Sequence, residues 1–108
     1  MRILFDHGTP SGIARALLDH EVVEARDLGC DRISNGDLLS AAEAAGFEIL
    51  LTTDKRIRSR QNLTDRKLAI VVLANSTWRV VRLYLERIRV GVDDAVAGSN
   101  IEIDIPFK

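Results

Sequence analysis

The chain contains an unbroken apolar segment, Leu68–Leu73, directly after a long polar stretch. A short continuous apolar run is typical of a strand that is covered on both faces, as in the middle of a parallel sheet. Further strands are predicted before it, at Arg2–Phe5, Glu21–Ala25 and Phe47–Thr52. The chain is therefore constrained to a sheet that needs an apolar layer on each side.

A helix is predicted over residues 10–19, between the first two strands. Thr9 is the expected cap, because it precedes a proline that suits the first helical position. Ile13, Leu17 and Leu18 form the side of this helix that we expect to be buried.

Two more helices are predicted further along. After a loop at 27–32, Ser34 is expected to cap a helix that ends at Gly46. The longest helix follows a cap at 75–77, and Gly91 is expected to bend it or end it early. Its apolar positions are three or four residues apart and comprise Trp78, Val81, Leu85, Ile88, Val92 and Val96.

A last strand is indicated by Ile101, Ile103 and Ile105, which alternate with acids and precede Pro106. This pattern is typical of a half-exposed edge strand. The whole order is βαβαβ, a basic connector, then βαβ. It predicts an α/β fold: a single three-layer α/β/α domain over residues 1–108 with a mainly parallel five-stranded sheet.

Composition excludes several classes of protein. The single cysteine, Cys30, excludes an internal disulfide framework and a four-cysteine zinc site. The N-terminal apolar segment meets an acid at Asp6, too early for a signal peptide, and no apolar run is long enough to span a membrane. We therefore expect a soluble, cytoplasmic domain with no membrane partner.

Charge is distributed unevenly along the chain. Residues 1–54 hold ten acids and four bases, whereas residues 55–108 hold six acids and eleven bases. The connector 55–67 alone has six bases and one acid, which suits a phosphate backbone. A solvated surface loop explains it equally well. If it binds nucleic acid, the candidate residues are Lys55, Arg56, Arg58, Arg60, Gln61 and Asn62.

Three acids are candidates for chemistry. Asp6 follows the first predicted strand, Asp54 follows the third, and Asp37 lies in the first turn of the second helix. Carboxyl ends of parallel strands share one edge, so these acids are expected to converge around a divalent cation. A metal-bound water there can attack a phosphodiester. The alternatives are that Asp37 is a capping acid and that Asp54 caps a short turn beginning at Lys55.

Several segments together resemble the short bacterial PIN-like family, which is related to VapC-type toxins of toxin–antitoxin pairs. They are residues 3–10, 35–39, 50–54, 61–63 and 69–73, and the match covers about residues 1–77. The resemblance implies a metal-dependent ribonuclease that acts on RNA with Mg²⁺ or Mn²⁺, and a cognate antitoxin protein as partner. It places metal binding and catalysis on Asp6, Asp37 and Asp54, with Thr53 orienting Asp54 by a hydrogen bond.

Two alternatives stay open. A receiver-like signalling module also has acids after its first and third strands; Asp54 would then accept a phosphoryl group, and Ser76 or Thr77 would be the switch hydroxyl. The other alternative is a PIN-like protein that has weak or lost activity and only binds a partner. Fuller PIN domains have a fourth acid, and the only counterpart in this sequence is Asp65, which lies in the basic connector. The edge strand and the long helix are candidate surfaces for a homodimer.

Overall fold

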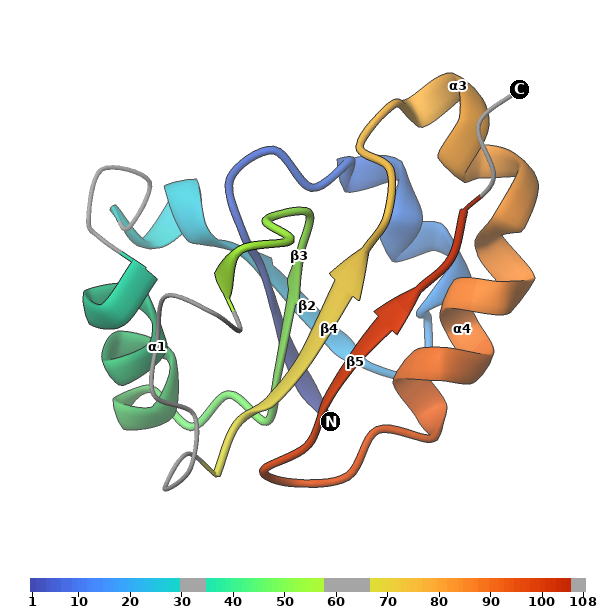
Figure 1. The fold of residues 1–108 in the computed structure, drawn as a ribbon. Helices are drawn as coiled ribbons and strands as arrows, with labels where there is room; N and C mark the ends of the chain where they lie inside the picture. Colours follow the sequence, from blue (N-terminus) through green and yellow to red (C-terminus); the bar gives the residue numbers. More distant parts are fainter. Residues whose placement is uncertain (30–34, 58–66, 106–108) are drawn as a thin grey trace.

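The computed structural model describes residues 1–29, 35–57 and 67–105, and it contains a five-stranded, fully parallel sheet (Figure 1). The strand order is β2-β1-β3-β4-β5. The strands are β1 (Arg2–Phe5), β2 (Glu21–Glu24), β3 (Ile49–Thr52), β4 (Ala69–Leu73) and β5 (Asn100–Ile103). The predicted α/β class is confirmed.

Helices cover both faces of the sheet. On one face α1 (Asn35–Ala44) packs with Leu38, Leu39 and Ala42 against a buried cluster that includes Leu4 and Leu50. On the other face lie the 3₁₀ helix η1 (Ser11–Ala16), α3 (Trp78–Val81), the 3₁₀ helix η3 (Arg82–Tyr84) and α4 (Leu85–Asp93) (Figure 1). The molecule therefore has three layers, as the alternating strand and helix patterns predict.

The strands follow the burial expected from their sequences. Every residue of β4 is buried, because the strand lies between β3 and β5 and is covered on both faces. β5 is an edge strand, and only Ile103 among its four residues is buried. Both predictions are confirmed.

The first helix is shorter than predicted. It is a 3₁₀ helix over Ser11–Ala16, and Leu18, expected to be buried, is 84% exposed. Its cap position is Pro10 rather than Thr9. The reason is that the Thr9 hydroxyl donates a hydrogen bond to the Leu51 carbonyl of β3 and so anchors the loop to the sheet instead of capping the helix.

The longest helix is interrupted, but not at Gly91. Tyr84, the last residue of η3, has φ −122° and ψ 23°, which breaks the helix before α4, and α4 continues through Gly91. A Cβ on Gly91 would lie 2.7 Å from Cδ1 of Ile103, so the glycine allows α4 to approach β5 closely. Trp78 and Val96, expected on the apolar side, are 38% and 67% exposed.

Two loop predictions need correction or lie outside the described residues. Where a loop was expected from residue 27, the structure has the 3₁₀ helix η2 (Ala25–Leu28), ended by Gly29 at φ +72°. The predicted cap Ser34 falls outside the described residues. Gly46 does end the second helix, with φ +83°. Across the described parts of the chain, no helix has the length and apolar character needed to cross a membrane.

Candidate functional site

The order of the strands changes direction at β1, which makes the carboxyl ends of β1 and β3 a topological switch point. From β1 it continues to β2 on one side, and it later returns to β3 on the other side. In parallel sheets the loops that leave two such neighbouring strands diverge, and the crevice at their carboxyl ends is where ligands bind. Asp6 follows β1 directly, and Asp54 follows β3 after one intervening residue. Both candidate acids therefore lie at this switch point.

A buried hydroxyl connects the two acids. The Thr52 side chain is fully buried at the end of β3, and its Oγ1 donates a hydrogen bond of 2.7 Å to Oδ2 of Asp6. The same oxygen accepts a hydrogen bond of 3.1 Å from the backbone N–H of Asp54. The Asp6 carboxylate and the Asp54 backbone nitrogen are thus separated by one shared oxygen.

Asp6 is held firmly but keeps capacity for a ligand. Its backbone N–H donates to the Leu51 carbonyl at 2.9 Å, which extends the β1–β3 ladder by one residue. Its Oδ1 accepts from the His7 N–H at 2.7 Å, and its Oδ2 accepts from Thr52. An ionised carboxylate has about four acceptor sites. The two bonds therefore fix the direction of the side chain and leave room for a cation, because Asp6 is only half-buried.

The loop after Asp6 is shaped by a short turn. The Thr9 N–H donates to the Asp6 carbonyl at 3.0 Å, and Gly8 between them has φ +91°, a conformation that favours glycine. The Thr9 hydroxyl, bonded to Leu51, then ties the far end of the turn to β3. The segment that carries Asp6 is therefore attached to the sheet at both ends.

Asp54 has a structural role as well as a candidate functional one. Its Oδ1 accepts a hydrogen bond of 2.9 Å from the Arg56 N–H, and its carbonyl accepts one of 3.3 Å from the N–H of the buried Ile57. The alternative that Asp54 caps a short turn beginning at Lys55 is confirmed. The cap also fixes the position of the carboxylate at the edge.

Asp37 is exposed in the first turn of α1, on the face of the sheet that this helix covers. Among the residues that the structure describes, no three His, Cys, Asp or Glu side chains gather closely enough to hold a metal ion. The structure thus brings Asp6 and Asp54 together but does not add Asp37 to form a three-acid cluster. A role for Asp37 through water stays a prediction.

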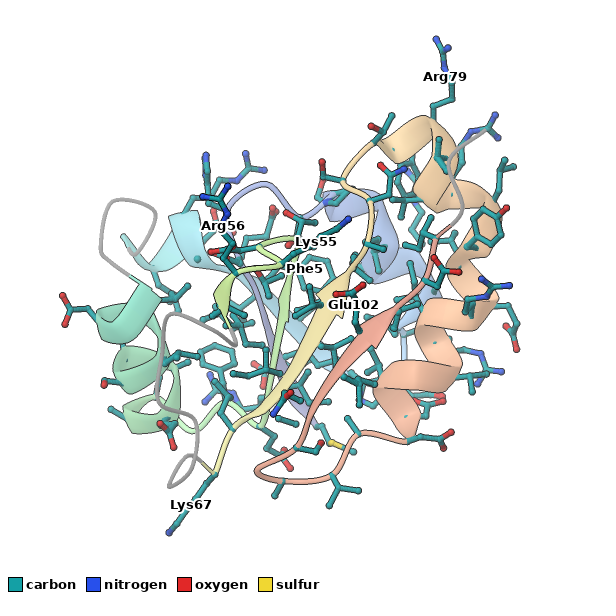
Figure 2. All side chains as sticks on the ribbon, in the orientation of Figure 1. Phe5, Lys55, Arg56, Lys67, Arg79 and Glu102 are labelled. Atoms are coloured by element: carbon teal, nitrogen blue, oxygen red, sulfur yellow. The ribbon has the colours of Figure 1, made fainter. Side chains whose placement is uncertain are left out.

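The basic connector is only partly described. Lys55 and Arg56 are exposed near the end of β1 that carries Phe5, whereas Lys67 lies at the opposite end of the sheet (Figure 2). The candidates Arg58, Arg60, Gln61 and Asn62 lie outside the described residues. Of the connector cations that the structure describes, Lys55 and Arg56 therefore lie beside the candidate site and Lys67 does not.

The sequence interpretation missed two features of the site. The hydroxyl of Thr52, which is buried at the end of β3, accepts a hydrogen bond from the Asp54 N–H, and the predicted role of Thr53 in orienting the Asp54 carboxylate stays a prediction. Glu24, the last residue of β2, is paired with Phe5 in the β1–β2 register and faces the same cavity as Asp6. An acid at a strand end is the signal that identified Asp6 and Asp54, and it also applies to Glu24.

The cavity beside Asp6 has a volume of about 300 Å³. It lies between the loops that follow β1 and β2, and its polar lining contains both signs of charge. Glu24 accepts a hydrogen bond from Arg26 at 3.3 Å, so the two partly neutralise each other. The cavity is lined by Phe5, Asp6, His7, Gly8, Thr9, Ser11, Glu24, Ala25 and Arg26.

Comparisons with protein-family models, with curated proteins and with solved structures gave no match for this chain. Mg²⁺ takes oxygen ligands, is commonly bound through one or two carboxylates and keeps several of its waters. Thr52 bonds the Asp6 carboxylate and the backbone N–H of Asp54, so the two acids that would supply such ligands are attached to the same side chain.

Proposed function

We propose that this protein is a metal-dependent ribonuclease of PIN-like type that hydrolyses phosphodiester bonds at the carboxyl edge of its sheet. The observation that carries the proposal is the Asp6–Thr52–Asp54 connection. It joins acids that are 48 positions apart in the chain at the switch point where parallel sheets bind ligands. The connection fixes the Asp6 carboxylate directly and holds the backbone of Asp54, whose own carboxylate is directed by its bond from the Arg56 N–H.

The proposed cofactor is Mg²⁺ or Mn²⁺, held by Asp6 and Asp54, with Asp37 contributing through water. A divalent ion at such a site supplies a nucleophilic water and stabilises the charge that develops on the phosphate. The chain's own residues position the ligands. Thr52 fixes the direction of the Asp6 carboxylate, and the turn at Arg56 fixes that of Asp54.

The RNA backbone is proposed to contact the exposed Lys55 and Arg56, which follow Asp54 directly. Arginine and lysine near a catalytic edge neutralise phosphate charge and position the strand without reading its sequence. A toxin role, with a cognate antitoxin as partner, belongs to the same proposal and rests on the resemblance to the PIN-like family.

The proposal is tested by incubating the purified protein with single-stranded RNA in Mg²⁺ or Mn²⁺ and following cleavage on a gel. We expect cleavage that chelation abolishes and that is lost in Asp6→Asn and Asp54→Asn. Asp104→Asn is the matched control, because Asp104 is exposed directly after β5 at the same edge of the sheet, two strands from Asp54. Equal loss in the control, or metal-independent cleavage, contradicts the proposal.

A receiver-like phosphoacceptor module is the second candidate. The order β2-β1-β3-β4-β5 is the one that flavodoxin-like and receiver folds share, and their ligands bind at the β1/β3 switch point. In this interpretation Asp54 accepts a phosphoryl group. Incubation with acetyl phosphate and Mg²⁺, followed by mass spectrometry, distinguishes the candidates: a stable phosphoryl adduct on Asp54 without RNA cleavage favours the receiver. Neither reaction, with binding of a partner protein, favours a PIN-like interaction protein.

A further inference from the structure

Trp78 is the only tryptophan of the chain, and it lies beside the candidate site rather than in the core. It is the first residue of α3, which follows β4, and it is 38% exposed, whereas the neighbouring Val80 and Val81 are buried. Its ring packs on the first helix after β1. Both elements follow carboxyl ends of strands, so the indole lies at the edge that carries Asp6.

The indole ring of Trp78 packs directly against Gly12. A Cβ on Gly12 would lie 2.5 Å from Cη2 and 2.6 Å from Cζ2 of Trp78. Rigid ring atoms cannot yield as a flexible side chain does, so only glycine leaves this space for the indole. The ring is therefore held in one place while part of its surface stays accessible.

The accessible part of the ring faces a pocket of about 350 Å³ that Pro10, Ser11, Gly12, Arg15 and Trp78 line. Among the described residues that line it there is no acid, and Arg15 is exposed. Arg79, next to Trp78, extends outward from α3 (Figure 2). An aromatic face with an arginine beside it in the same pocket suits a planar group carried on an anionic chain.

Ser11 connects this pocket with the candidate active site, because it lines both this pocket and the cavity beside Asp6. A group stacked on Trp78 is consequently placed next to the position where a phosphate would meet Asp6. We infer that Trp78 is a stacking platform for a nucleobase of single-stranded RNA, with Arg15 contacting the adjoining phosphate. This inference rests on the proposed ribonuclease function and names the part of the substrate that the site recognises.

Because the chain has one tryptophan, its fluorescence reports on this pocket alone. We would titrate the protein with oligouridylate in the presence of EDTA, which prevents cleavage, and compare an abasic oligonucleotide of equal length and charge. Stacking predicts strong quenching by oligouridylate and weak quenching by the abasic chain. Binding of a labelled RNA, followed by anisotropy, should weaken about tenfold in Trp78→Ala and less in Trp78→Phe.

Two further variants separate stacking from loss of folding. Gly12→Ala keeps the tryptophan but displaces its ring, and it should reduce quenching while circular dichroism stays that of the folded chain. Arg15→Gln should weaken RNA binding more than Lys67→Gln, which removes the same charge at the opposite end of the sheet (Figure 2). Equal effects of the two charge variants contradict the role of Arg15.

The outcomes distinguish this inference from the proposed function. Quenching by oligouridylate without cleavage in Mn²⁺ supports the stacking platform and overturns the nuclease. Cleavage that Trp78→Ala leaves unchanged, or equal quenching by the abasic chain, overturns the platform and leaves the nuclease standing. If no RNA quenches the fluorescence of Trp78, the stacking platform is overturned. If a bound protein quenches it instead, the pocket belongs to that protein partner.

Discussion

Replacement of Thr52 by valine tests the connection between the two acids most directly. Valine has nearly the shape of threonine, so Thr52→Val leaves the fully buried side chain packed and removes only the hydroxyl. The Asp6 carboxylate then loses a donor, and the Asp54 N–H loses its acceptor. Both groups are half-buried, and water replaces the lost partner only in part.

The expected loss follows from the two bonds. A hydrogen bond to a charged group contributes about 1.5–3 kcal/mol and a neutral one about 1 kcal/mol, and partial resolvation offsets some of this. We therefore expect Thr52→Val to lower the free energy of unfolding by about 2 kcal/mol, which lowers Tm by about 10 °C in a domain of this size.

Urea unfolding followed by circular dichroism measures this loss, and the neighbouring threonine provides the control. Thr53→Val removes a hydroxyl from a half-buried position one residue away and should change the free energy of unfolding by less than about 0.5 kcal/mol. Thr52→Ser keeps the hydroxyl and loses one buried methyl group, worth about 0.8 kcal/mol. If Thr52→Val is as stable as Thr53→Val, or more stable than Thr52→Ser, the hydroxyl does not hold the edge together.

Three other results are expected. The hydrogen bond with His20 is the main cause that holds the pKa of Asp93 below its ordinary value. The ionised Asp93 therefore stabilises the folded state at pH values above the ordinary pKa of an aspartate, and this stabilisation is lost as the pH falls and the carboxylate is protonated. Asp93→Asn should be less stable than the wild type near pH 6, and the difference in Tm between the two proteins should close toward pH 3. A gap that persists in acid contradicts this assignment. Gly46→Ala should lower the free energy of unfolding by about 1 kcal/mol in urea, because φ is +83° where α1 ends, and an unchanged midpoint would show that the turn adapts. Leu17→Ala should cost about 3 kcal/mol, whereas Leu18→Ala should be within about 0.5 kcal/mol of the wild type, since the two side chains are 1% and 84% exposed; thermal unfolding of both variants compares them, and equal losses would refute this burial.

The sheet was predictable because its strands carry their own signal. The continuous apolar run of β4 and the alternation in β5 reflect burial on two faces and on one face, and the structure has both. Parallel pairing followed from the helices between strands. The order of the strands did not follow, since apolar patterns indicate that a strand is covered but not which strand lies beside it.

The helices on the face that carries η1 were predicted less well, for a tertiary reason. Thr9 has the preferences of a cap, but its hydroxyl bonds the Leu51 carbonyl of another strand, and that contact is invisible to local patterns. Leu18 would lie on the apolar side of a regular helix over residues 10–19. Because η1 ends at Ala16, Leu18 lies outside the helix and is exposed. The helical spacing of apolar residues therefore predicted burial wrongly at positions where the chain does not have regular helical geometry.

The candidate site shows the same division. Asp6 and Asp54 were identifiable as strand-end acids because the carboxyl ends of parallel strands meet. The part played by Thr52 was not identifiable, since it depends on which of two adjacent threonines points inward between β1 and β3. Glu24 satisfied the same strand-end rule as the two aspartates and was overlooked, although it faces the cavity beside Asp6.

The distribution of cations around the site also depends on the fold. The connector is the most basic segment of the sequence, but it begins beside Asp54 and its last residue, Lys67, lies at the far end of the sheet (Figure 2). Arg15 comes from the acidic half of the chain and lines the Trp78 pocket next to the candidate site. On the proposed function, a strand of RNA that contacts both Arg56 and Arg15 would pass Asp6 and reach Trp78 along the carboxyl edge of the sheet.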